Sequence, residues 1–179
     1  RAGRRRDVKF PLTLWDVFRV KSQSAPPRRA AKKQTARQDR YDLLVEDMKR
    51  TWSIRVRKWR SHTSGCAWEL RGRDGTVTRM IEAPYPRGPM SCVVFLHEVG
   101  HHATGFNRGG PRCLEEHRAW EWALREMAAR GFNVTERVRK RRDEAMRYAI
   151  RKALRRGLKR VPQELVRWLP KGVHAAEAS

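Results

Sequence analysis

Residues 95–102 read Phe-Leu-His-Glu-Val-Gly-His-His, which places the pattern His-Glu-x-x-His directly after apolar residues. On a helix, His97 and His101 lie four positions apart and project from one face, so that both imidazoles can bind one Zn²⁺. Glu98 is then placed to take a proton from a water whose pKa the metal lowers from about 15.7 to about 7. The alternative is an ordinary helix that carries these histidines by chance. The spacing favours a zinc site with Glu98 as its catalytic base.

The composition indicates one globular domain with polar ends. A chain of 179 residues is long enough to bury a core, but a mean hydropathy of −0.83 limits that core to part of the chain. No apolar run reaches the roughly 18 residues of a membrane span, and no apolar stretch follows the basic N-terminus as in a signal peptide. The cysteines, Cys66, Cys92 and Cys113, are odd in number and form no Cys-x-x-Cys pair. We therefore expect a reducing, cytoplasmic location, with association with a virus particle as an alternative.

The net charge of +23 is concentrated at the two ends of the chain. Residues 1–40 hold 13 basic against 3 acidic residues, and residues 131–171 hold 14 against 4, whereas residues 71–130 hold 9 against 7. Such ends attract polyanions through phosphate contacts and counterion release, so DNA or RNA is an expected partner. The alternative is an arginine-rich composition with solvated faces. The candidate contacts are Arg4, Arg5, Arg6, Arg28, Arg29, Lys32, Lys33, Arg147, Arg151 and Arg155.

The same patterning divides the chain into three parts. Residues 1–40 are predicted to be a basic, largely disordered arm with a short apolar docking segment at 10–18, because proline and charge interrupt it. Residues 41–131 hold the metal motif and form the expected domain, and residues 132–179 form a basic helical extension.

The expected fold class is α+β. A helix over 41–50 precedes three strand-like runs at 52–59, 65–71 and 76–82, and an Asp-Gly turn at 74–75 joins the last two. The simplest arrangement is a three-stranded antiparallel meander. Helices are then predicted over 90–102, over 113–130, from Asn133 or Thr135 to about 156, and briefly over 162–169.

A catalytic zinc usually takes a third protein ligand, and the helix over 113–130 offers Glu115, Glu116 and Glu121. Glu116 shares its face with Ala119 and Ala123, whose small side chains allow a neighbouring helix to pack closely. We therefore favour Glu116, with Glu115 as second choice and Glu121 as an exposed charge.

Neighbouring residues are given other roles. His102 points about 100° away from His101 on the helix, so it is not expected to be a ligand. His117 is interpreted as a surface histidine rather than as an oxyanion stabiliser. Trp120 and Trp122 are expected to flank the site and exclude water.

This arrangement resembles the gluzincin metallopeptidases, which combine His-Glu-x-x-His with a glutamate from a following helix. More narrowly, residues 40–130 resemble the small ImmA/IrrE-like zincins of phages, mobile elements and bacterial stress responses. In that family a motif E-x-x-A-x-x-[FW]-A supplies the third ligand, and residues 116–123 here read Glu-His-Arg-Ala-Trp-Glu-Trp-Ala. Residue 120 is Trp where family members often carry Asn, and the Met-Pro ending common after that helix is absent.

The resemblance implies a minigluzincin-like domain that holds one Zn²⁺ through His97, His101 and Glu116. It also implies a metallopeptidase of narrow specificity that acts near nucleic acid, in which zinc-bound water attacks a peptide carbonyl with Glu98 as general base. A protein or peptide substrate would lie along the exposed sheet edge. The alternative is a non-catalytic nucleic-acid-binding or assembly protein on a zincin fold, in a phage particle or a ribonucleoprotein.

Overall fold

The computed structural model describes residues 36–170. The predicted apolar docking segment and the basic residues from Arg4 to Lys33 lie outside the described residues, as do residues 171–179. The first described element is the helix α2 (Ala36–Trp52), which contains the predicted helix over 41–50 and extends beyond it at both ends. Its buried residues recur at helical spacing and are Tyr41, Leu44, Val45 and Met48.

Three strands follow α2 and form one mixed sheet: β1 (Ile54–Arg60), β2 (Cys66–Arg71) and β3 (Val77–Pro84). The strand order is β1-β3-β2. The strands β2 and β3 pair antiparallel across the predicted Asp-Gly turn, where Gly75 adopts a φ of 82°. The strand β1 pairs with β3 in parallel, so the prediction of an all-antiparallel meander is wrong.

The mixed order follows from burial. The strand β3 is the most buried of the three, and its residues Ile81 and Ala83 have no exposed surface, so it takes the central position. Residues 61–65 carry the chain past the end of β3 from β1 to β2. That is a distance of two strand spacings, about 10 Å, which a short extended loop can span. An alternating sequence pattern identifies each strand but carries no information about its neighbour.

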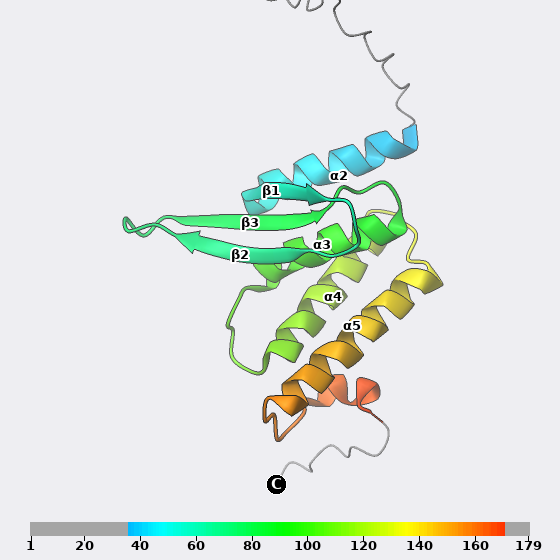
Figure 1. The fold of residues 1–179 in the computed structure, drawn as a ribbon. Coiled ribbons are helices and arrows are strands. Elements are labelled where there is room, and N and C mark those ends of the chain that lie inside the picture. The colour runs from blue at the N-terminus through cyan, green and yellow to red at the C-terminus, as the bar shows by residue number, and fades with distance from the viewer. Residues whose placement is uncertain (1–35, 171–179) are drawn as a thin grey trace, which may run out of the picture. The chain divides into compact units, whose positions relative to one another are not determined.

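Three helices and a short 3₁₀ helix complete the described chain: α3 (Pro89–Thr104), α4 (Arg112–Ala129), α5 (Glu136–Arg155) and η1 (Gln163–Trp168). Proline at the first position starts α3. Thr135 starts α5 by accepting a hydrogen bond from the Val138 amide. The helix α3 packs on β3 and β2, and α4 and α5 lie on the side of α3 away from α2 (Figure 1).

One hydrophobic core joins these elements, and α5 and η1 contribute to it. Val138, Met146 and Ile150 of α5 and Leu165 of η1 are fully buried in the same cluster as the apolar residues of α3 and α4. The boundary placed at residue 131 therefore marks a change of charge, while the packing continues across it. Within residues 36–170, no helix combines the length and the apolar character needed to cross a membrane.

The helices α3 and α4 are in close contact at Gly100. A Cβ atom built on Gly100 would lie 2.8 Å from the carbonyl oxygen of Ala119 and 3.2 Å from its Cα. Because backbone atoms cannot rotate away as a side chain can, this position excludes any larger residue without moving a helix.

We expect the Gly100→Ala substitution to lower the free energy of unfolding by about 2 kcal/mol, because the added methyl overpacks the helix interface. This loss should appear although alanine is the better helix former by about 1 kcal/mol. Denaturant unfolding of the two chains measures it. A variant as stable as the parent chain would show that α3 and α4 can separate without cost.

Candidate metal centre

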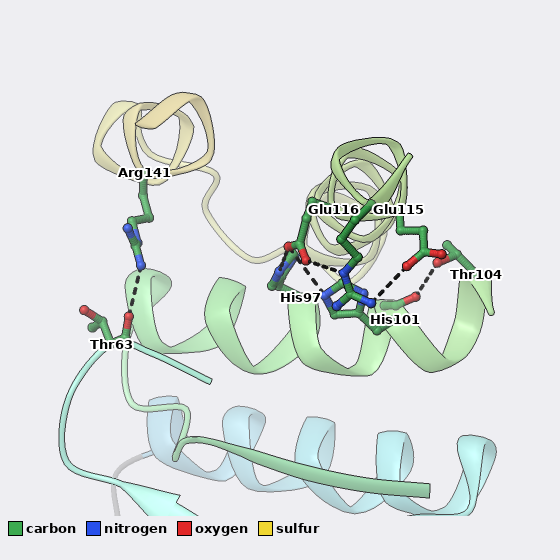
Figure 2. Close-up of polar contacts among 9 residues, drawn as sticks. Thr63, His97, His101, Thr104, Glu115, Glu116 and Arg141 are labelled. Atoms are coloured by element: carbon green, nitrogen blue, oxygen red, sulfur yellow. Dashed lines mark hydrogen bonds and ion pairs between the residues drawn. The ribbon is translucent and has the colours of Figure 1, made fainter. Parts of the chain in front are cut away.

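The predicted ligands meet between α3 and α4. His97 and His101 project from α3 toward Glu116 on α4 (Figure 2). One carboxylate oxygen of Glu116, Oε2, lies 3.2 Å from His97 Nε2 and 3.6 Å from His101 Nε2. One ligand atom from each of the three residues lies within 4.8 Å of the others, so this group could hold a metal ion.

Aromatic rings hold the two imidazoles in place. The ring of His97 stacks on Trp120 with centroids 4.3 Å apart, and His101 lies against Phe106. A metal-binding histidine usually donates its second ring N–H to a carbonyl or carboxylate. Here Nδ1 of His97 is buried without a hydrogen-bond partner within residues 36–170. The stacked Trp120 therefore fixes the ring orientation that a hydrogen bond fixes elsewhere.

A single arginine orients the carboxylate of Glu116. Arg112, one helical turn earlier, donates from Nε to Oε1 of Glu116 at 3.2 Å and leaves Oε2 for the histidines. Arg112 also donates to Glu115, whose other oxygen accepts from the Asn107 amide at 2.8 Å. Glu115 is thus held at the loop before α4, away from the two histidines.

Glu121 forms ion pairs away from the two histidines. It pairs with Arg142 at 3.3 Å and with Arg167 at 3.5 Å, which links α4 to α5 and η1. Of the carboxylates that the sequence offered, the structure brings only Glu116 to both histidines within residues 36–170.

The charge states of this cluster fit a divalent cation. Burial lowers the pKa of His97 to about 4, so its imidazole is neutral at pH 7 and has a lone pair to offer. Burial acts to raise the pKa of Glu116, but hydrogen bonds from His101 and His97 outweigh burial and lower it. A carboxylate and a neutral imidazole are donors that zinc accepts.

Glu98 follows His97 on α3 and is only 5% exposed. Burial and, to a smaller extent, the nearby Glu116 carboxylate raise the pKa of its carboxyl to about 8. Gly65, just before β2, makes room for this side chain. A Cβ atom built on Gly65 would lie 2.5 Å from Cγ and 2.7 Å from Cδ of Glu98.

The Gly65→Ala substitution is expected to cost about 1–3 kcal/mol of folding stability, because the methyl overlaps the Glu98 side chain. The Glu98→Ala substitution removes the overlapping atoms, so the double variant should recover most of the stability that Gly65→Ala loses. Thermal unfolding of both single variants and the double variant measures this coupling. Strictly additive losses of stability in the double variant would show that there is no steric overlap between the two side chains.

The cluster opens into a cavity of about 930 Å³. It is lined by residues 64–67 at the edge of the sheet, α3, Pro111 and α4, one face of α5, and residues 156–158 after α5. Glu98, His97, His101 and Glu116 all contribute to its wall. The arrangement therefore combines a candidate metal site, a buried carboxyl group and an open cavity with space for a ligand.

The remaining singled-out residues lie elsewhere. Nε2 of His102 lies 3.1 Å from the Met80 carbonyl oxygen, which joins α3 to β3. His117 packs against Trp168 of η1 rather than facing the cluster. Trp120 flanks the site as expected, but Trp122 packs edge-on against Trp52 and does not line the cavity.

Sequence reasoning missed Gly65 and Arg112 as parts of the site. Arg112 precedes Glu116 by four residues, a spacing that indicates an ion pair on a helix and could have identified it. No local signal marks Gly65, since its role depends on contact with a distant helix. Of the predicted nucleic-acid contacts, Arg147, Arg151 and Arg155 lie in the described chain, and all three are exposed on α5.

Comparison of the chain with protein-family models, with curated proteins and with solved structures gives no match.

Proposed function

We propose that this protein is a zinc-dependent metallopeptidase with a gluzincin-like site on a minigluzincin-like fold. The observation that carries the proposal is the convergence of His97, His101 and Glu116 beside a buried Glu98 at the wall of one cavity. A purely structural zinc site needs no neighbouring base, whereas hydrolysis needs one. Three protein ligands, with a further position left for water or substrate, are typical of catalytic zinc.

The proposed roles follow from the surroundings of each residue. His97, His101 and Glu116 would hold Zn²⁺, which supplies a Lewis acid that polarises a carbonyl and lowers the pKa of water. Glu98 takes a proton from the attacking water as the new carbon–oxygen bond forms. It then donates that proton to the departing amine nitrogen as the carbon–nitrogen bond breaks. Burial raises the pKa of the Glu98 carboxyl well above its usual range, which suits a group that must hold a proton and then donate it.

The sheet offers a place for the substrate backbone. Among the described strands β2 pairs only with β3, so its other edge is open, and residues 64–67 at the start of this edge line the cavity. An extended peptide can add to such an edge through main-chain hydrogen bonds. This would place a peptide bond between β2 and the metal-binding cluster.

Two measurements on the full chain test the proposal. Elemental analysis should find one zinc per chain after reconstitution, and the loaded protein should cleave members of a diverse peptide library. Cleavage should stop on chelation and return with added zinc. A chain that takes up no zinc, or whose cleavage is indifferent to a chelator, would refute the proposed activity.

A second function is favoured by the exposed arginines of α5 together with the net charge of +23. Here the protein binds DNA or RNA, as a partner of the peptidase or as an assembly protein on the same fold. Arg147, Arg151 and Arg155 recur at every fourth position and form one line on the helix, which we call the outer stripe.

The triple variant Arg147→Ser, Arg151→Ser and Arg155→Ser tests this function. If each arginine neutralises a phosphate, the slope of log affinity for duplex DNA against log salt should become shallower by about 2 to 3. A triple variant on the sheet and its hairpin turn, Arg55→Ser with Arg71→Ser and Arg73→Ser, removes the same charge from other exposed positions and controls for the change in net charge. Equal effects in the two variants would assign the binding to overall charge rather than to the outer stripe.

A further inference from the structure

The helix α5 presents a second line of basic residues, distinct from the outer stripe, to the inside of the cavity. Arg141, Tyr148, Lys152 and Arg156 all line the cavity, and Ala145 lies among them. Arg141, Ala145, Tyr148 and Lys152 fall at i, i+4, i+7 and i+11, which keeps them on one face of α5, and Arg156 follows as the residue that caps its C-terminus. We call Arg141, Lys152 and Arg156 the cleft stripe.

The charges of the cleft stripe are not neutralised by the described part of the protein. The ion pairs found within residues 36–170 do not include Arg141, Lys152 or Arg156. Arg141 donates to the Thr63 carbonyl at 3.3 Å, which joins α5 to the loop before β2 (Figure 2). Its Nε is buried without a hydrogen-bond partner in that part of the chain. One acid, Glu144, lies on the same wall and leaves an excess of positive charge there.

Three other arginines, one each on α4, α5 and η1, behave differently. Arg112, Arg142 and Arg167 each pair with at least one carboxylate in the structure. The cleft stripe therefore stands out as a set of cations that face a ligand-sized space without counter-charges. An anionic ligand would supply the missing negative charges.

The rest of the cavity wall indicates which anion fits. Glu98 and Glu116 line the same cavity, and their carboxyl groups disfavour a phosphate backbone beside them. A peptide presents a neutral backbone to those carboxyl groups and can carry its acids on side chains farther along. Alanines and Tyr148 between the cations provide apolar contact for an extended chain.

We propose that the cleft stripe is a specificity subsite that selects peptide segments carrying Asp or Glu near the bond to be cleaved. The proposal rests on the peptidase function and names its substrate class. The cleft stripe and the start of β2 line the same cavity, so a peptide paired with the open edge of β2 can direct alternate side chains toward α5.

The test compares two double variants with the same change in net charge. Lys152→Glu with Arg156→Glu alters the cleft stripe, and Arg151→Glu with Arg155→Glu alters the outer stripe. Binding of a fluorescein-labelled glutamate-rich peptide to each full chain is followed by anisotropy at physiological salt, beside the same peptide with glutamine. The cleft variant should lose about tenfold in affinity for the acidic peptide, while the outer variant should lose no more than about twofold. Thermal unfolding confirms that both variants are folded.

Equal losses of affinity for the acidic peptide in the two variants would overturn the proposed subsite. It would also be overturned if the cleft variant lost as much affinity for single-stranded DNA as for the acidic peptide. Cleavage of the peptide library by zinc-loaded wild type is the second readout. Cleavage sites should be enriched in Asp and Glu, and the cleft variant should lose that enrichment. Cleavage at sites that are not enriched in Asp or Glu would refute the subsite but not the peptidase activity. Selective binding of the acidic peptide without any cleavage would refute the proposed peptidase activity but not the subsite.

Discussion

The Glu98→Gln variant should bind one zinc per chain and cleave peptides about a thousandfold more slowly than the parent protein, the scale of loss expected for a general acid–base residue. Glutamine keeps the size of the side chain, so it still fits beside Gly65 and disturbs neither neighbouring ligand. It can neither accept a proton from water nor deliver one to the leaving nitrogen. The substitution should therefore slow the chemical step and leave zinc binding unchanged.

Single-turnover cleavage by zinc-loaded wild type and Glu98→Gln measures this effect, with elemental analysis on the same samples. The loss should lie in kcat rather than in peptide affinity, since a proton-transfer residue acts in the transition state. A variant that retains full activity would remove Glu98 from the mechanism. A variant that loses zinc as well would make Glu98 a part of metal binding.

The second large effect concerns zinc affinity. Removing a ligand should cost more than the roughly 10- to 100-fold that loss of an outer partner typically costs. We therefore expect His101→Ala to weaken zinc binding by more than about a hundredfold. Glu116→Gln should weaken it less, because an amide oxygen remains to coordinate the metal.

The matched control is Glu115→Gln, which makes the same chemical change one position earlier. Its oxygen can still accept from the Asn107 amide, so zinc affinity should change little. Competition against a chromophoric chelator measures affinity in all variants. Equal losses for Glu115→Gln and Glu116→Gln would mean that the third ligand has been wrongly assigned.

The convergence of His97, His101 and Glu116 could be predicted because its geometry is local. His97 and His101 share a face by helical spacing alone, and Glu116 could be preferred because Ala119 and Ala123 allow α4 to approach α3. The structure shows that approach at Gly100, which leaves no room for a Cβ atom beside the backbone of Ala119. Here the residues that set the packing lie in the same two helices as the ligands.

The order of the strands could not be predicted in the same way. Alternation in residues 52–59 identifies a half-buried strand, but it does not say which neighbour the strand pairs with or in which direction. The position of β3 in the centre depends on how many of its residues the helices cover. Burial of that kind is a property of the whole fold.

The contribution of α5 to the cavity was missed for a related reason. Its many arginines and lysines indicated a basic extension, and the pattern alone does not say which of them face inward. Arg151 and Lys152 are neighbours in sequence, yet only Lys152 lines the cavity. Contacts with distant segments such as residues 63–67 decide that difference.

The shared core has a consequence for how this protein can be dissected. Because Val138, Met146, Ile150 and Leu165 belong to the core, a chain cut at residue 131 would expose the apolar surface that they cover on α4. It would also lack one wall of the cavity. If such a truncated chain lost DNA binding or peptide cleavage, unfolding would explain the loss as well as the removal of basic residues would. Point substitutions on exposed faces of α5 can separate the two, whereas deletion mapping cannot.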